Sequence, residues 1–149
     1  MSLAGHKARL RRARLIERVR SAEQRKAASN AYQAEAIRLK LEQLSERTRS
    51  LAQLYALRDT AEDAADLRGA AILGTHLRQL GLTASRQANE ARREADDRLA
   101  DLAAAERRLQ RAGESRRELH RSILEQLGRI DATPARKIGP TRKTGTHLE

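Results

Sequence analysis

The sequence lacks residues that many folds depend on: it has no cysteine, phenylalanine or tryptophan, and its only aromatic residues are two tyrosines. Without cysteine, a disulfide framework and a thiolate metal site are both excluded. Because large side chains are scarce and 34% of the residues are charged, we do not expect a thick globular core.

Long apolar runs are missing as well. The longest uncharged run near the centre, residues 69–77, is much shorter than the roughly 20 residues that a membrane span needs. The beginning of the sequence is basic but has no apolar stretch of the kind found in secretory signals. We therefore expect a soluble protein in the cytoplasm.

Good helix formers dominate what remains, chiefly Ala, Arg, Glu, Leu and Gln. Such a composition is typical of coiled coils when apolar residues recur regularly. Low hydrophobicity and a net charge of +11 are also typical of disordered chains. Periodicity decides between these two interpretations.

From about Lys7 to Tyr55, an apolar or small residue recurs at steps of three or four positions or their sums. This spacing predicts a helix with a heptad seam, which is interrupted at Arg20, Glu23, Asn30 and Thr48. The apolar or small seam residues are Ala13, Ile16, Ala27, Ala34, Ile37, Leu41, Leu44, Leu51 and Tyr55.

A second seam keeps alternating steps of four and three through sixteen positions. A strict repeat of this kind predicts a long helix in a left-handed supercoil. Its residues are Leu77, Gly81, Ala84, Ala88, Ala91, Ala95, Arg98, Leu102, Ala105, Leu109, Ala112, Arg116, Leu119, Ile123, Gln126 and Ile130.

The two seams flank a hinge, residues 59–81, that holds three of the eight glycines. We predict an all-α fold: one antiparallel coiled-coil hairpin with arms at about 7–66 and 70–131 and a turn at Asp66–Gly69. In the predicted register Thr48 faces Ala88 and Ala27 faces Leu109, so that large and small residues alternate across the seam. Residues 132–149, which contain both prolines, are predicted to be a disordered basic tail.

Charge is distributed unevenly along this hairpin. Residues 1–30 carry nine Lys or Arg against Glu17 and Glu23, whereas residues 59–66 carry four acids and no base. The hairpin therefore has a basic open end and an acidic tip. The basic cluster at Arg9, Arg11, Arg12 and Arg14 is compatible with a protein partner, with nucleic acid or membrane phospholipid, or with a solvated face.

Just after the turn, Ile72, Leu73, Leu77 and Leu80 form the densest apolar patch of the chain. They either pack within the tip or remain available to a partner, because a thin hairpin cannot bury all four. We expect no enzymatic activity, metal or cofactor. The four histidines are far apart in sequence, and no pocket is expected in which carboxylates could be activated.

The chain resembles the flagellar type III export proteins of the ATPase-stalk family (FliJ-like), which has counterparts in virulence secretion systems. The resemblance covers most of the chain: two long helices, a basic first arm, and the stretch AILGTHLRQLG after the turn, with QANEARREADDRLADLAAAERRLQRAGESRREL farther on.

This resemblance implies a central stalk that couples a hexameric export ATPase to a membrane export gate, and it also implies escort of export chaperones. Arg9, Arg11, Arg12 and Arg14 would meet the ATPase, and the four apolar residues after the turn would meet the gate. The protein would then lie at the inner face of the cell membrane through its partners. The competing hypotheses are a basic helical protein associated with nucleic acid or ribosomes, and a structural coiled-coil homodimer.

Overall fold

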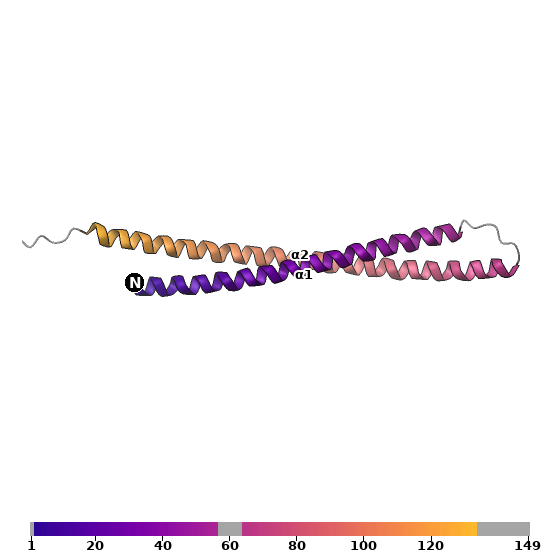
Figure 1. Ribbon diagram of the computed structural model, residues 1–149, viewed down its shortest axis with the longest axis horizontal. Helices are drawn as coiled ribbons and strands as arrows, with labels where there is room; N and C mark the ends of the chain where they lie inside the picture. The colour runs from indigo at the N-terminus through magenta and orange to yellow at the C-terminus, as the bar shows by residue number, and fades with distance from the viewer. Residues whose placement is uncertain (1, 57–63, 134–149) are drawn as a thin grey trace, which may run out of the picture.

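The computed structural model describes residues 2–56 and 64–133. These residues form two α-helices and no strand: α1 runs Leu3–Ala56 and α2 runs Ala64–Ala132. The helices pack antiparallel along one another, so the start of α1 and the end of α2 share one end of a long rod (Figure 1). At 1.5 Å per residue, α1 is about 80 Å long and α2 about 100 Å. The prediction of an all-α helical hairpin is confirmed.

The first helix begins earlier than the predicted Lys7. Ser2 caps it: the backbone N–H of Gly5 donates a hydrogen bond to the Ser2 hydroxyl oxygen at 3.2 Å, and the N–H of His6 donates to the Ser2 carbonyl at 3.1 Å. A serine side chain at this position satisfies one of the backbone donors left free in the first helical turn. The basic N-terminal residues are therefore helical from Leu3 onward.

The predicted turn at Asp66–Gly69 is wrong, because these residues lie inside the first turns of α2. No glycine among the described residues has a positive φ, so Gly69 does not cap a helix. Its neighbours are good helix formers, and one helical glycine costs only about 1 kcal/mol. The first arm is described as far as Ala56. The rest of its predicted length falls on residues 57–63, which lie outside the described part, and on residues 64–66, which belong to α2. The predicted tail lies outside it from residue 134 onward.

The seam of α2 is confirmed for fifteen of its sixteen predicted positions. Every one from Leu77 to Gln126 is buried or half-buried. The exception is the last, Ile130, which is 56% exposed near the end of the rod.

The seam predicted for α1 is correct at only about half of its positions. Every second predicted position faces α2, but the positions between them are displaced by one residue, so that Glu17, Ala31 and Ala52 are covered instead of their neighbours. The large residues that were predicted to fill the seam are instead exposed. These are Ile16, Ile37, Leu44 and Leu51.

Small residues form the contact between the helices. Of the ten buried apolar residues in the described part, eight are alanines, and Ala95 is the most covered at 1% exposure. Because alanine projects little beyond the backbone, two alanine-lined helices can approach closely without voids. Three larger residues of α1, Ile37, Leu44 and Leu51, stay outside the seam and are about half exposed.

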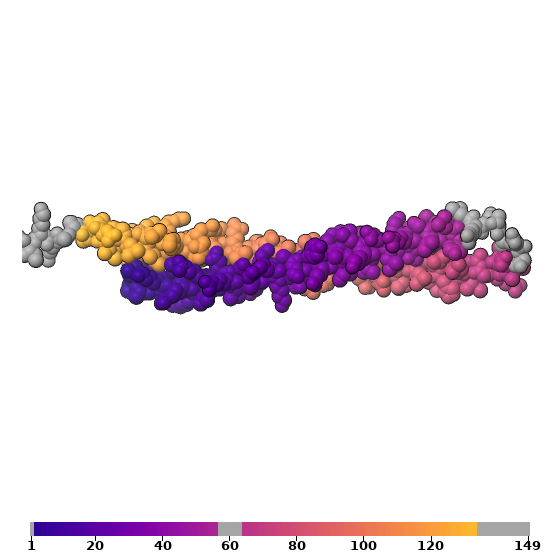
Figure 2. All heavy atoms as spheres, in the orientation of Figure 1, coloured from indigo at the N-terminus to yellow at the C-terminus, as the bar shows by residue number. Residues whose placement is uncertain are grey.

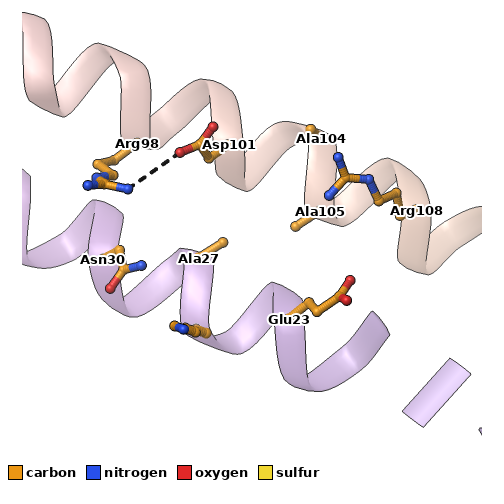
Figure 3. A pocket seen from close by; sticks show the side chains of 9 residues that line it. Glu23, Ala27, Asn30, Arg98, Asp101, Ala104, Ala105 and Arg108 are labelled. Atoms are coloured by element: carbon orange, nitrogen blue, oxygen red, sulfur yellow. Dashed lines mark ion pairs between the residues drawn. The ribbon is translucent and has the colours of Figure 1, made fainter. Parts of the chain in front are cut away.

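The predicted register is also wrong. A Cβ added to Gly81 would lie 3.8 Å from Cγ2 of Thr48, so Thr48 faces Gly81 rather than Ala88. Ala27 lies across from Ala105 rather than Leu109, and both line the hollow in Figure 3. Both of these contacts bring one small residue against another, whereas the prediction placed the larger Leu109 opposite Ala27.

Two ion pairs cross from one helix to the other. Nε of Arg116 donates to a Glu17 carboxylate oxygen at 2.6 Å, and an Arg92 nitrogen donates to Glu42 at 2.8 Å. On α1, Arg38 binds both Glu35 and Glu42. Because Glu17 lies on the seam and Glu42 directly beside it, these contacts disfavour a register slip that would leave the charges unpaired.

Candidate interaction surfaces

The rod offers grooves rather than a deep pocket on the face that Figure 2 displays. Figure 3 shows one of them, an open hollow between the helices lined by Glu23, Asn30, Arg98 and Asp101 among others. Arg98 is held there by Glu94 at 2.9 Å and by Asp101 at 3.6 Å. In residues 2–56 and 64–133, no group of three His, Asp or Glu side chains could hold a metal ion. The features that remain to be compared among the described residues are the exposed surfaces along the two helices.

The Arg38 network perturbs two carboxyl groups. A hydrogen bond from Arg92 lowers the pKa of Glu42 below its ordinary value of 4.5, with a further contribution from the charge of Arg38. A hydrogen bond from Arg38 lowers the pKa of Glu35 in the same direction. Both groups therefore remain ionised in the folded hairpin at moderately acidic pH, which is the behaviour of structural ion pairs.

The four apolar residues that were predicted to meet a partner after the turn do not form one patch. Leu77 faces α1 and is half-buried, whereas Ile72, Leu73 and Leu80 are exposed. Leu73 and Leu80 are seven positions apart and so share one side of α2. Ile72 lies on the side of α2 that points away from α1, nearly opposite Leu77 around the helix.

Three residues of α1 lie on the same side of the rod as Leu73 and Leu80. Glu23 and Asn30 share a groove with Asp101 and Arg108, which fixes these α1 and α2 positions on one side. Steps of seven residues along each helix stay on that side, because the seam itself repeats every seven. On α1, seven-residue steps from Asn30 toward the hinge reach three large aliphatic residues. On α2, seven-residue steps from Asp101 toward the hinge reach Leu80 and then Leu73. The three residues are Ile37, Leu44 and Leu51.

We call this side near the hinge the apolar flank: Ile37, Leu44, Leu51, Leu73 and Leu80. Its side chains are between 41% and 59% exposed. The three α1 members were visible in the sequence as a heptad stripe but were assigned to the seam. A single-helix pattern cannot tell a seam stripe from a flanking stripe one residue away. The partner helix makes that distinction, because it selects the smaller residues.

At the open end of the rod, Arg9, Arg11, Arg12 and Arg14 are all exposed on α1. Successive residues rotate by about 100° around a helix, so the four do not form one patch. Arg11 and Arg12 point away from α2, while Arg9 and Arg14 lie on opposite flanks. Leu10 and Ala13 occupy the buried side. The four arginines therefore form a basic collar around three sides of α1.

The predicted acidic tip can be located only in part. Asp66 is exposed in the first turn of α2, whereas Asp59, Glu62 and Asp63 lie outside the described residues. The basic collar at the opposite end is fully described, and among the described residues none of its four arginines takes part in an ion pair.

In comparisons with known proteins, no family model, no curated protein and no solved structure matches the chain. Neither described helix combines the length and apolar character required to cross a bilayer. The two surfaces and the geometry that separates them are therefore the basis for assigning a function.

Proposed function

We propose that this protein is a non-catalytic rod that binds one partner at its basic collar and another at its apolar flank. The observation that carries the proposal is the separation of two chemically different surfaces on one hairpin. Arg12 and Leu51 lie on the same helix, 39 residues apart in sequence, or about 60 Å at 1.5 Å per residue. A rod of this kind acts by holding its partners at a fixed distance.

The particular form that we propose is the central stalk of a flagellar or virulence type III export apparatus. In it, Arg9, Arg11, Arg12 and Arg14 enter the lumen of the hexameric export ATPase. The arrangement of these arginines around α1 suits a ring of acidic groups better than a flat surface, because charges on several sides meet a surrounding wall. The support for this form is the two-helix hairpin, the basic collar and the family resemblance of the sequence.

At the other end, Leu73 and Leu80 contact the membrane export gate, and the α1 members of the apolar flank widen this contact. Ile72 and Leu77 were predicted to share the role. Ile72 would need a partner that wraps around the tip of α2, and Leu77 contributes by holding α2 against α1. The protein then sits at the inner face of the cell membrane through its partners, and escort of export chaperones is a further role on the same rod.

A pull-down from the organism that encodes the protein tests both ends at once. In one variant the four collar arginines become Glu, and in a second Leu73→Asp and Leu80→Asp are combined. We expect the first to lose the ATPase and to keep the gate protein, and the second to do the reverse. Recovery of nucleic acid or ribosomes alone, with no export component, would overturn the stalk proposal.

Matched controls separate these effects from general changes in charge and polarity. Leu39→Asp and Leu82→Asp change exposed aliphatic residues that lie off the apolar flank, and should leave both partners bound. Four exposed bases along the middle of the rod, changed to Glu, alter the net charge by the same amount as the collar variant. These bases are Lys40, Arg47, Arg86 and Arg93.

The heptad spacing of the apolar flank favours a second candidate, a structural homodimer. Two flanks could pack together as a four-helix assembly, since an isologous interface uses one surface twice. Light scattering on the purified chain tests this candidate. A mass of two chains that falls to one chain when Leu44→Asp and Leu51→Asp are combined would favour it over the stalk.

A further inference from the structure

The side of α1 that points away from α2 near the N-terminus has a composition found nowhere else on the rod. We call it the outer face: Arg11, Arg12, Leu15, Arg18, Val19 and Lys26. All six side chains are exposed. They lie opposite Leu10, Ala13 and Glu17, which face α2, because helical positions rotate by about 100° per residue.

No carboxylate lies on this face. The two acids of the segment are both engaged elsewhere: Glu17 binds Arg116 of α2 at 2.6 Å, and Glu23 binds Arg20 at 2.8 Å. None of the four bases of the outer face forms an ion pair with any described residue. Their charge is therefore free to attract an anionic surface.

Large aliphatic side chains stand among these bases. Leu15 is 58% exposed and Val19 57%. A nucleic acid would neutralise the bases through its phosphates but would leave these aliphatic groups in water. An anionic bilayer accommodates both the bases and the aliphatic side chains, because its phosphates lie just above the acyl chains that receive apolar side chains.

We propose that the outer face docks on an anionic phospholipid surface, with the rod lying flat and α2 on the side away from the lipid. Arg11, Arg12, Arg18 and Lys26 contact headgroup phosphates. Leu15 and Val19 enter the boundary between headgroups and acyl chains. The lipid proposal does not rest on the stalk proposal. The outer face shares Arg11 and Arg12 with the collar, so lipid and ATPase exclude one another there, but its aliphatic residues belong to neither proposed partner site.

Vesicle flotation with the purified full-length chain tests the proposal. Vesicles of phosphatidylcholine and phosphatidylglycerol in equal parts should carry the protein upward, and vesicles of phosphatidylcholine alone should not. Combining Leu15→Ser with Val19→Ser should weaken binding at least about tenfold, since each buried methylene contributes favourably to partitioning. Combining Arg11→Glu, Arg12→Glu and Arg18→Glu should abolish binding. Circular dichroism confirms that each variant remains helical.

The matched control combines Leu82→Ser with Leu124→Ser, two exposed leucines on α2, the helix that lies away from the lipid. It should bind as the unchanged protein does. Absence of binding to the anionic vesicles would overturn the proposal. Binding that survives the Leu15 and Val19 changes would overturn it too, because adsorption would then be electrostatic only. Tight binding to duplex DNA that is indifferent to those two changes would assign the face to nucleic acid.

Discussion

The seam and the apolar flank of this hairpin lie side by side, yet they contain opposite kinds of residue. The seam buries mostly alanine, whereas the flank leaves five leucines and isoleucines at 41–59% exposure. A thick core would bury the large residues first. Here two helices alone cannot enclose them, so packing selects residues that allow close approach. The large residues remain outside, where a partner can cover them.

This difference also limits the stability of the rod. Burying an alanine methyl removes little apolar surface, and burial yields only about 25 cal/mol per Å². The hairpin therefore depends on the fit along the whole seam and on the two ion pairs that cross it. A substitution in the seam should therefore lower the free energy of unfolding more than an equal substitution on the apolar flank.

The largest effect should come from a charge placed in the tightest part of the seam. Ala95→Asp places a carboxylate at a position that is only 1% exposed, and we expect the free energy of unfolding to fall by about 3 kcal/mol. The control is Ala100→Asp on the exposed side of the same helix, which has the same loss of helix propensity, under about 1 kcal/mol. Equal melting temperatures for the two variants, measured by circular dichroism, would contradict an alanine-packed seam.

The next effect separates two leucines that look alike in the sequence. Leu41 is half-buried in the seam, and Leu44, one turn later, is 50% exposed on the apolar flank. We expect Leu41→Gln to cost about 2 kcal/mol and Leu44→Gln less than about 1 kcal/mol, because glutamine has a similar helix propensity and only burial differs. Urea denaturation measures both. A larger cost at Leu44 would restore the register predicted from the sequence.

How far the sequence predicts this fold differs between the helices. In α2 one stripe, running through Ala84, Ala88, Ala91 and Ala95, is flanked by charged residues, so the seam was found correctly. In α1 two stripes lie one residue apart. The stripe through Ile37 and Leu44 is more hydrophobic, but the stripe that is covered contains Ala31 and Ala52. Hydrophobicity favours burial of the Ile37 stripe, whereas close packing favours burial of the Ala31 stripe. Only the facing helix decides which of the two stripes is buried.

The turn and the arrangement of the candidate surfaces were also not determined by the local sequence alone. Gly69 indicated a helix end, but a glycine also fits inside a helix when its neighbours are good helix formers, and local sequence alone does not distinguish these cases. The exposure of the basic cluster was predictable from charge. Its arrangement as a collar, and the addition of α1 residues to the apolar flank, depended on knowing which side of each helix is covered.

A smaller effect should come from the ion pair nearest the open end. Glu17 and Arg116 are each about one third exposed, so their pair should contribute only about 0.5–1 kcal/mol. A double-mutant cycle with Glu17→Gln and Arg116→Gln measures this coupling in the free energy of unfolding. The comparison pair is Glu46 and Arg49, 3.7 Å apart within one turn of α1 and far more exposed, for which we expect coupling near zero. Equal coupling in the two cycles would mean that the contact between helices adds nothing.

The smallest effect concerns pH. Because hydrogen bonds from arginine lower the pKa of Glu42 and Glu35 below 4.5 in the folded protein, both carboxylates stabilise the hairpin at any pH above their unfolded pKa. That contribution is lost as the pH falls below 4.5 and through the lower folded values. Glu42→Gln, which removes the negative charge that Arg92 and Arg38 bind, should therefore be less stable than the unchanged protein at neutral pH and nearly equal to it in strong acid. Glu90→Gln, an exposed change outside this network, should show no such convergence in melting temperature between neutral and acidic pH. If the two variants followed parallel pH profiles, the Arg92–Glu42 contact would have no part in holding the helices in register.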